Sequence, residues 1–453
     1  MTRLLFLLLT TLVVFSSCKN ENRLYRIQES GLYGFIDSLG NVVIEPQYRY
    51  VSPFTKDGYA CVISNIKIEE DTKALPLLGY ETGKDSVLIV TYGYINNANE
   101  LAIDTTNRVK IPFMNVNDWG GTELIESAHM YLEGKLKFRT NILNELALCD
   151  GLFIYQDENS GLFGYKDING NIKIDAKYSS CRYFNDGAAI VRFKRGANMD
   201  FSEMLNCCGV INTAGDSVFS GYTMIQDFRN DGMTWALTTS ISEERVMRDW
   251  VQIDKKGNIK TGPIPNVHWI YNSKEYPICV IDMGFIGTFY TFLDEKGDFL
   301  SDFNNDKELA LGMGEDSRSE LFKDVTRFSD GVAGIKGYND NGQSAWYFVE
   351  RNFIPMSEPY DSLLPFSEGL AAVKELTFIG EQSSHWGKWG FVKMQSSDST
   401  IVQAIPYSFS ECGSFAGGLA YFMNEGSTFD MEGFINHQGK IVWQTKRQKE
   451  TFK

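Results

Sequence analysis

Apolar and polar positions follow the same order again and again along this chain of 453 residues. Each copy opens with an aromatic-Gly-aromatic step and passes through a Gly-Asn or Asn-Gly turn to an apolar pair. A Pro-x-Tyr or x-Lys-Tyr element follows, and the copy ends in Phe-x-x-Gly-x-Ala-x-Val. Short apolar runs bounded by Gly and Asn predict strands joined by tight turns. The pattern therefore predicts an all-β protein in which each copy is a small three-stranded meander.

The aromatic-Gly-aromatic step is clearest at residues 31–37, 161–165, 388–392 and 432–436. Gly164 and Gly209 are 45 residues apart and Gly390 and Gly433 are 43 apart, while other gaps are longer where loops intrude. Units that repeat in this way bury their apolar faces against their neighbours. The sequence therefore predicts eight or nine units in tandem, several of them degenerate.

The Ala-x-Val strand of residues 370–373 is expected to pair with the aromatic-Gly-aromatic strand at 388–392, and the turn then returns the chain into a third strand. Glycine in the middle of a strand has no side chain to pack. We therefore expect Gly34, Gly164 and Gly390 to let an aromatic side chain of the neighbouring unit lie across the backbone.

Two assemblies can bury such meanders: an open solenoid-like array, or a closed β-propeller with blades of about 40 to 45 residues. The open array is favoured, because the units are unequal and three strands are one fewer than a propeller blade usually has. The closed propeller is the alternative. Residues 65–150 depart furthest from the repeat, and within them 123–146 allow a short helix or an irregular insertion.

The best-preserved copy runs Lys-Trp-Gly-Phe-Val over residues 388–392, Ile-Pro-Tyr over 405–407 and Phe-Ala-Gly-Gly-Leu-Ala over 415–420. It resembles the WG repeat family, whose consensus runs roughly Lys-Trp-Gly-aromatic-Ile-Asp, a turn, Val-Ile-Pro-Pro-x-Tyr-Asp, and Phe-x-x-Gly-Leu-Ala-x-Val. The resemblance covers most of the chain after about residue 28. It implies N-terminal repeats with a divergent insertion over 28–150, a repeat array over 151–453, and a general scaffold of the cell envelope with no named ligand.

The N-terminus carries a second signal. Arg3 precedes an apolar run over residues 4–15, which is too short to span a bilayer, and small residues then lead to Cys18. This arrangement resembles the lipobox of bacterial lipoproteins. The resemblance implies a signal peptide over 1–17, a lipidated Cys18, and a tether that extends to residue 27. An ordinary secretory signal with a coincidental cysteine is the alternative.

The implied anchor is strong, because several acyl chains each contribute about 0.8 kcal/mol per buried CH2. Lys19 is not the acidic neighbour that retains some lipoproteins in the inner membrane, so the resemblance favours the outer membrane of a bacterium. Which face of that membrane carries the repeats is left open.

Composition and charge narrow the set of partners. Aromatics at 13%, 41 glycines and 11 prolines suit strands and turns. The net charge of −15 excludes a basic surface for DNA or RNA, and it keeps the array off an anionic membrane except through the lipid. After Cys18, an odd number of cysteines remains, so they cannot all pair. Cys61 and Cys181 are expected to be buried, and Cys207 or Cys208 is a disulfide candidate if the compartment is oxidising.

Residues for catalysis or metal binding are sparse. The four histidines are far apart, and no nucleophile motif or phosphate-binding glycine loop occurs. Residues 302–313 begin like a calcium loop, yet Lys307 stands where glycine is needed and Met313 where the closing carboxylate is needed. No catalytic residue, metal site or cofactor is predicted.

The densest aromatic cluster supplies the candidate binding residues. Trp386 and Trp389 lie with His385 in one short segment, and Trp386 falls outside the repeat register. Aromatic rings at repeat positions usually interlock in the core, so Trp386 is the best candidate for an exposed contact.

Three functional hypotheses follow. The leading one is a lipid-anchored, non-catalytic scaffold that binds proteins of the envelope or of a partner cell. A glycan-binding surface lipoprotein is the second, and a hydrolase with a carboxylate pair on a propeller is the third. The expected partner is thus an envelope or extracellular protein, with polysaccharide as the alternative, and no enzyme activity is expected.

Overall fold

The structure is a computed structural model. It describes residues 23–71, 85–113, 130–132, 135–137, 146–194, 196, 199–242, 245–265, 267–273, 275–282, 288–300, 322, 324–339, 341–377, 387–395 and 400–448.

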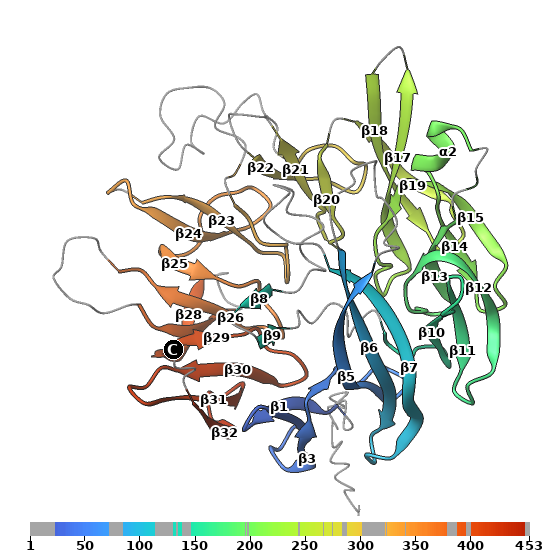
Figure 1. Cartoon of the computed structure of the whole chain (residues 1–453). Helices are drawn as coiled ribbons and strands as arrows, with labels where there is room; N and C mark the ends of the chain where they lie inside the picture. The colour runs from blue at the N-terminus through green and yellow to red at the C-terminus, as the bar shows by residue number, and fades with distance from the viewer. Residues whose placement is uncertain are drawn as a thin grey trace, which may run out of the picture.

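Almost all of the regular structure is β-strand, and seven sheets of three to six strands stand in a ring as a seven-bladed β-propeller (Figure 1). The N-terminal half contributes β1 (Tyr25–Glu29), β2 (Leu32–Ile36), β3 (Val42–Tyr48), β4 (Tyr50–Val51), β5 (Tyr59–Asp71), β6 (Asp85–Asn96), β7 (Leu101–Phe113), β8 (Met130–Leu132), β9 (Lys135–Lys137), β10 (Leu152–Gln156), β11 (Phe163–Asp167), β12 (Ile172–Cys181), β13 (Ala188–Phe193), β14 (Cys208–Asn212), β15 (Ser217–Tyr222) and β16 (Met224–Ile225).

The C-terminal half continues the ring back to its start. It contributes β17 (Met233–Ser242), β18 (Arg245–Asp254), β19 (Ile259–Pro265), β20 (Trp269–Tyr271), β21 (Ile278–Asp282), β22 (Thr288–Phe292), β23 (Ala333–Tyr338), β24 (Ser344–Val349), β25 (Tyr360–Leu363), β26 (Ala371–Glu375), β27 (Trp389–Met394), β28 (Ile401–Phe409), β29 (Glu411–Cys412), β30 (Leu419–Asn424), β31 (Phe429–Asn436) and β32 (Ile441–Gln448). The helix α2 (Phe201–Leu205) begins with a capping box between Asp200 and Glu203.

The sequence repeats map onto the ring as nine units, because each of the two six-stranded sheets holds two of them. In the well-preserved units the Ala-x-Val segment is the first strand, the aromatic-Gly-aromatic segment is the second, and the strand after the turn is the third; the described part of unit 6 has only the first two strands. Units 1 to 9 are β1–β3, β5–β7, β10–β12, β13–β15, β17–β19, β21–β22, β23–β25, β26–β28 and β30–β32. The predicted pairing is confirmed, since Val373 lies opposite Gly390 between β26 and β27.

The structure corrects the predicted open solenoid to a closed ring. The argument for the open array counted three strands per unit, yet the end of one unit's third strand also pairs with the first strand of the next unit. The short strands β4, β16, β20 and β29, and the ends of β12 and β25, supply this extra strand. A unit thus obtains its fourth strand from the unit before it, and this explains why the sequence appeared one strand short.

Side chains of units 9 and 1 close the ring. Tyr25, Ile27 and Ile36 of unit 1 form one apolar cluster with Leu419 of unit 9, and the Tyr25 hydroxyl donates a hydrogen bond to the carbonyl of Gly417. Figure 1 shows the blue strand β1 beside the red strands β31 and β32. Burial of these side chains makes the ends of the array neighbours, which an open solenoid would not do.

Aromatic pairs fill the spaces between units. In five places a phenylalanine just before a unit's first strand packs on a ring from the second strand of the preceding unit, with centroids 4.7 to 5.0 Å apart. Such tilted pairs add about 0.5–1.5 kcal/mol each beyond the area they bury. The pairs are Phe35–Phe54, Tyr165–Phe184, Phe292–Phe328, Phe348–Phe366 and Phe391–Phe415.

The central glycine of the second strand has a different role from the one predicted. A Cβ on Gly34 would lie 2.4 Å from the carbonyl oxygen of Ile44, and a Cβ on Gly390 would lie 2.7 Å from that of Ile405. In both units the register of the third strand shifts at this glycine. The glycine therefore admits the backbone of its own unit's third strand at a bulge, and not an aromatic ring of the neighbouring unit.

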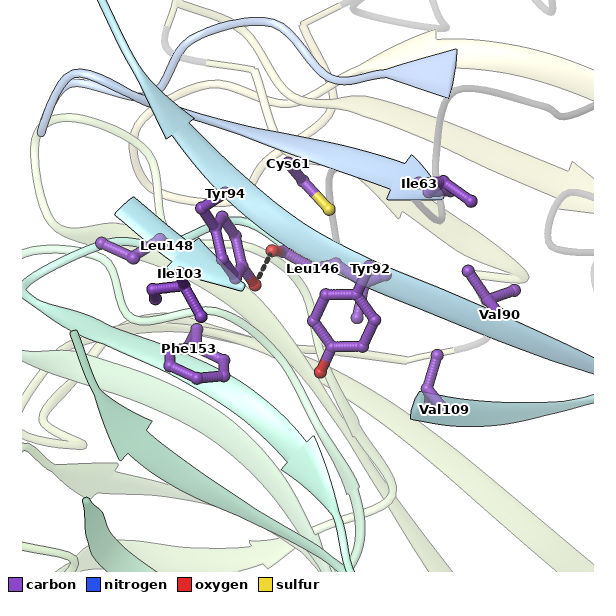
Figure 2. Packing of buried hydrophobic residues seen from close by; sticks show 10 residues of the cluster. All are labelled: Cys61, Ile63, Val90, Tyr92, Tyr94, Ile103, Val109, Leu146, Leu148 and Phe153. Atoms are coloured by element: carbon purple, nitrogen blue, oxygen red, sulfur yellow. Dashed lines mark hydrogen bonds between the residues drawn. The ribbon is translucent and has the colours of Figure 1, made fainter. Parts of the chain in front are cut away.

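Unit 2 contains the largest departure from the repeat. Its strands β5, β6 and β7 are 13, 12 and 13 residues long and form an extended antiparallel sheet. Figure 2 shows how Tyr92 and Tyr94 of β6 pack toward Phe153 of unit 3, with the Tyr94 hydroxyl donating to the carbonyl of Leu146 at 2.5 Å. Where the sequence allowed a helix over 123–146, the residues that the structure describes form the hairpin β8–β9 instead.

Two further points concern the chain as a whole. The seven cysteines after Cys18 are free thiols, and Cys61 is buried as predicted, whereas Cys181 is partly exposed. Among the described residues, no helix is long and apolar enough to cross a membrane.

Candidate interaction surfaces

Three of the four predicted site residues, Cys18, His385 and Trp386, lie outside the described residues, as does the calcium-like loop 302–313. Trp389 lies in β27 between Lys374 of β26 and Phe409 of β28. Its side chain is partly buried against the core between units 8 and 9. The structure therefore assigns Trp389 a packing role, and its proposed contact with a ligand stays a prediction.

Tight turns of one kind line the same edge of seven units, and they set the geometry of the surface there. In unit 5, the Asp254 carboxylate accepts hydrogen bonds from the backbone N–H groups of Lys256 and Asn258, both at 2.9 Å. The side-chain hydrogen bond from Asn258 is the main reason why the pKa of Asp254 falls to about 2. The same arrangement recurs at Asp37, Asn96, Asp167, Asn212, Asp294 and Asn436. These turns keep the third strands at a constant position from unit to unit.

A second set of turns cross-links successive units at the same edge. Asp150 of unit 3 accepts the backbone N–H of Gly187 at 2.7 Å, and Glu368 of unit 8 accepts that of Gly418 at 2.9 Å. Lys56 forms ion pairs with both Asp150 and Asp186. In the part of the chain that the structure describes, no three His, Cys, Asp or Glu side chains gather where they could hold a metal ion. These acidic side chains therefore hold successive units together through hydrogen bonds and ion pairs.

An exposed apolar side chain follows the turn in eight of the units. These side chains are between 39% and 59% exposed and stand just after the turn, in six units within the first two residues of the third strand. We call them the apolar rim: Val42, Leu101, Ile172, Val218, Ile259, Phe299, Ile354 and Ile441. The sequence analysis did not identify these residues as a surface, although an apolar residue follows the turn in each of these eight units.

Contacts between neighbouring units place the rim residues in succession around the ring. The turn glycine of one unit packs on the third strand of the unit before it. Gly215 of unit 4 lies against Ile174, two residues after Ile172, and Gly439 of unit 9 lies against Ile405. The turn of each unit therefore packs beside the third strand of the unit before it, so the rim residues follow one another around the ring.

The hairpin β17–β18 exposes a further apolar group at the opposite edge. Ile241 and Val246 lie directly opposite each other across the two strands and are 45% and 59% exposed. Met247 is 48% exposed beside them. A hairpin tip with three exposed apolar side chains can bury them only against another surface.

Polar groups gather in a shallow depression of about 510 Å³ at unit 7, lined by Gly331, Glu350, Arg351 and Asn352. The Arg351 guanidinium lies over the ring of Tyr276, 5.8 Å from its centroid. Glu350 is the one carboxylate among these lining residues. The depression can accept hydrogen-bonding groups, but its lining does not pair an acid with a base.

Burial, and not a catalytic environment, raises the pKa values of these thiol and phenol groups. Desolvation raises the pKa of Cys412 to about 12, and it also raises the pKa of Tyr178 to about 12. Such groups are neutral at physiological pH, and a neutral thiol is a poor nucleophile. These residues are part of the cores between units.

A family model described as WG containing repeat matches residues 33–65, 163–196 and 360–375. The chain contains WG repeats at these three places. The first match covers the second strand of unit 1 through to the first strand of unit 2, and the second match covers the equivalent stretch of units 3 and 4. A WG repeat therefore spans one joint of the ring, because it runs from one unit's second strand into the next unit's first. No curated protein matches this WG repeat chain.

Solved structures with a similar fold are distant. TolB from Acinetobacter baumannii is 10% identical, with 87% of this chain and 80% of that chain covered and a TM-score of 0.27. An uncharacterised protein from Listeria monocytogenes is 7% identical, with 58% and 79% covered and a TM-score of 0.33. An acylaminoacyl peptidase from Pyrococcus horikoshii is 9% identical, with 85% and 57% covered and a TM-score of 0.28. At TM-scores this low, the matches carry no argument about the function of the WG repeat chain.

Proposed function

We propose that this WG repeat propeller is a non-catalytic interaction scaffold of the bacterial cell envelope, anchored in the outer membrane through a lipidated Cys18, and that its partners are envelope or extracellular proteins. The apolar rim is the observation that carries the proposal. Isolated apolar side chains are common on protein surfaces, but here six of the eight stand at one register position, opposite the residue six places earlier in the chain, and Val218 and Ile354 stand one place from it.

A protein partner suits this surface better than a small ligand. Each rim residue is about half exposed, and its remaining apolar area can be removed from water at about 25 cal/mol per Å². A protein partner with a broad surface can contact the rim residues of several units at once, and it then buries the most apolar area.

The test of the rim compares two pairs of substitutions on the same strands. The soluble form from Asn20 onward is immobilised and exposed in parallel to envelope extract and to a panel of polysaccharides. Ile172→Ser with Ile259→Ser should reduce capture of a bound protein by at least about tenfold, equivalent to 1.4 kcal/mol. Lys173→Ser with Lys260→Ser is the matched control, because these neighbouring side chains are 53% and 49% exposed.

Equal capture by the rim variant and the control variant would contradict the rim as a binding surface. Retention on one polysaccharide with no protein captured would instead favour the second candidate, a glycan-binding lipoprotein. The depression at Arg351 is the feature that favours this candidate. Arg351→Ala should then abolish the retention.

The anchor has its own test. Cys18→Ser removes the thiol that would carry the diacylglycerol, so the protein should move from the membrane pellet to the soluble fraction. Persistence of the variant in the pellet would contradict lipidation at this residue, and it would leave the test of the rim unaffected.

A further inference from the structure

Six joints of the ring share one backbone hydrogen bond in the same register. In each, an N–H near the end of one unit's third strand donates to a carbonyl in the middle of the next unit's first strand, at 2.8 to 3.0 Å. The six bonds are Ser52 to Cys61, Arg182 to Ile190, Gln226 to Trp235, Thr326 to Gly334, Leu364 to Ala372 and Gly413 to Tyr421. Strand addition of this kind uses the main chain for affinity and side chains for specificity.

The segments that make these bonds also share side chains. A residue with an apolar or thiol side chain immediately precedes the donor, and a phenylalanine stands two positions after it. The segments are Val51–Phe54, Cys181–Phe184, Ile225–Phe228, Val325–Phe328, Leu363–Phe366 and Cys412–Phe415. We call this pattern the joint motif, an apolar residue or cysteine followed three positions later by phenylalanine.

At the seam between units 9 and 1 the described residues contain no such segment. The carbonyl of Arg26 occupies the accepting position, because Arg26 lies opposite Phe35 just as Cys61 lies opposite Tyr94. Within the described ranges, β1 pairs only with β2, so its other edge lacks a partner strand. Unpaired sheet edges are templates for the addition of another strand.

The third strand of unit 9 does not move across to cover this edge. In unit 1, the pairing between β2 and β3 shifts at Gly34, and β3 then leads into β4 of the next blade. In unit 9, β32 shows no shift at Gly433 and stays paired with β31 as far as Gln448, opposite Phe429. The Pro-x-Tyr element that accompanies the crossing in other units is replaced by Thr445-Lys446-Arg447.

Among the described residues, no phenylalanine covers the equivalent aromatic ring at the seam. Phe434 follows Gly433 as Phe35 follows Gly34 and Phe391 follows Gly390. Phe35 and Phe391 are fully buried beneath Phe54 and Phe415. Phe434 is partly exposed, and its nearest aromatic neighbour from unit 1 is Tyr25, with ring centroids 5.9 Å apart. The open strand edge and the uncovered ring therefore lie at the same seam.

We propose that the seam binds an extended segment of a partner protein that carries the joint motif. The segment adds a strand to the free edge of β1, its backbone N–H donates to the carbonyl of Arg26, and its phenylalanine covers Phe434. This inference rests on the proposed function and names the class of partner and the binding site. The six internal joints define the chemistry of the partner, because each is an example of the same addition within one chain.

The probe is a fluorescent peptide with the sequence of residues 359–367, which contains the joint Leu363–Phe366. It is titrated against the soluble form from Asn20 onward and followed by fluorescence anisotropy. Phe366→Ala in the peptide, or N-methylation of the Leu364 amide, should each weaken binding by at least about tenfold. Phe434→Ser in the protein should do the same, while Phe429→Ser on the same strand is the matched control and should leave binding unchanged.

Competing occupants give distinct results. If deletion of residues 20–22 or of 449–453 strengthens peptide binding tenfold or more, the chain's own end covers the edge and the proposal is overturned. A dimer that dissociates in the Phe434→Ser variant identifies a second copy as the occupant and also overturns it. Failure of the peptide to bind any of these forms rejects the seam site. The capture experiment on the rim is independent, so it shows whether the scaffold function stands when the seam site fails.

Discussion

Among the described residues, unit 9 is joined to unit 8 by backbone pairing between strands and by side chains, whereas no pairing between strands joins it to unit 1. Between units 8 and 9, the Gly413 N–H donates to Tyr421 at 3.0 Å and Phe415 covers Phe391. At the seam, the described contacts are the Tyr25 hydrogen bond and an apolar cluster. A repeat array makes its joints from the chain that connects consecutive units, but no such connection links its last unit to its first. Closure therefore depends on side chains of the two terminal units.

The largest expected difference is in aromatic packing. Phe391→Ala should lower the free energy of unfolding by about 3–5 kcal/mol, because the ring is fully buried and leaves a cavity. Phe434→Ala at the seam should cost only about 1–2 kcal/mol, because part of that ring is already in water. Urea denaturation of both variants measures the two losses. Equal losses would show that the seam is packed as tightly as a joint.

Substitution of the central glycine should rank next. Gly390→Val places a Cβ only 2.7 Å from the carbonyl oxygen of Ile405, and a backbone obstacle cannot move aside as a side chain can. The expected loss is about 1–3 kcal/mol or more, measured as a drop in Tm. Gln403→Val is the control, at an exposed position of the neighbouring strand β28. An unchanged Tm for Gly390→Val would contradict the bulge.

Alkaline pH should weaken the joints through their buried thiols. Desolvation raises the pKa of Cys412 to about 12 in the folded state, while the unfolded thiol titrates near its ordinary value. The stabilisation is therefore complete below pH 9 and is lost as the pH rises from about 9 toward 12. Cys412→Ala should make the loss of stability over this range shallower, as followed by urea denaturation at each pH. An identical slope would rule out ionisation of this thiol as a contributor.

The smallest expected effect is at the seam hydroxyl. Tyr25→Phe removes the hydrogen bond to the Gly417 carbonyl and should cost about 0.5–1.5 kcal/mol while the ring stays packed on Phe434. Tyr25→Ala, which also removes the ring, should cost more. If Tyr25→Phe is as damaging as Tyr25→Ala, the hydroxyl contributes most of the closure at this position.

Much of the local structure could be predicted because it depends on neighbouring residues. The turn at residues 37–41 needs an aspartate and a glycine at fixed spacing, and the pairing of 371–374 with β27 needs only apolar strands of similar length. The role of Gly390 was predicted less well. A glycine in a strand signals a close approach, but the pattern does not say whether a ring or a backbone approaches. The apolar rim was missed because exposure depends on which face the neighbouring unit covers.

By itself, the sequence determined that the protein is a tandem array of three-stranded β units with tight turns and a phenylalanine before the first strand of most units, since these features follow from residue types at short spacing. Only the tertiary structure decided that the array closes into a propeller. Closure depends on the accumulated rotation from unit to unit and on whether the first and last units meet, and neither quantity is contained in a single repeat. For the same reason the seam could not be predicted from the sequence. Its two parts, the edge of β1 and the ring of Phe434, lie side by side only in the closed ring.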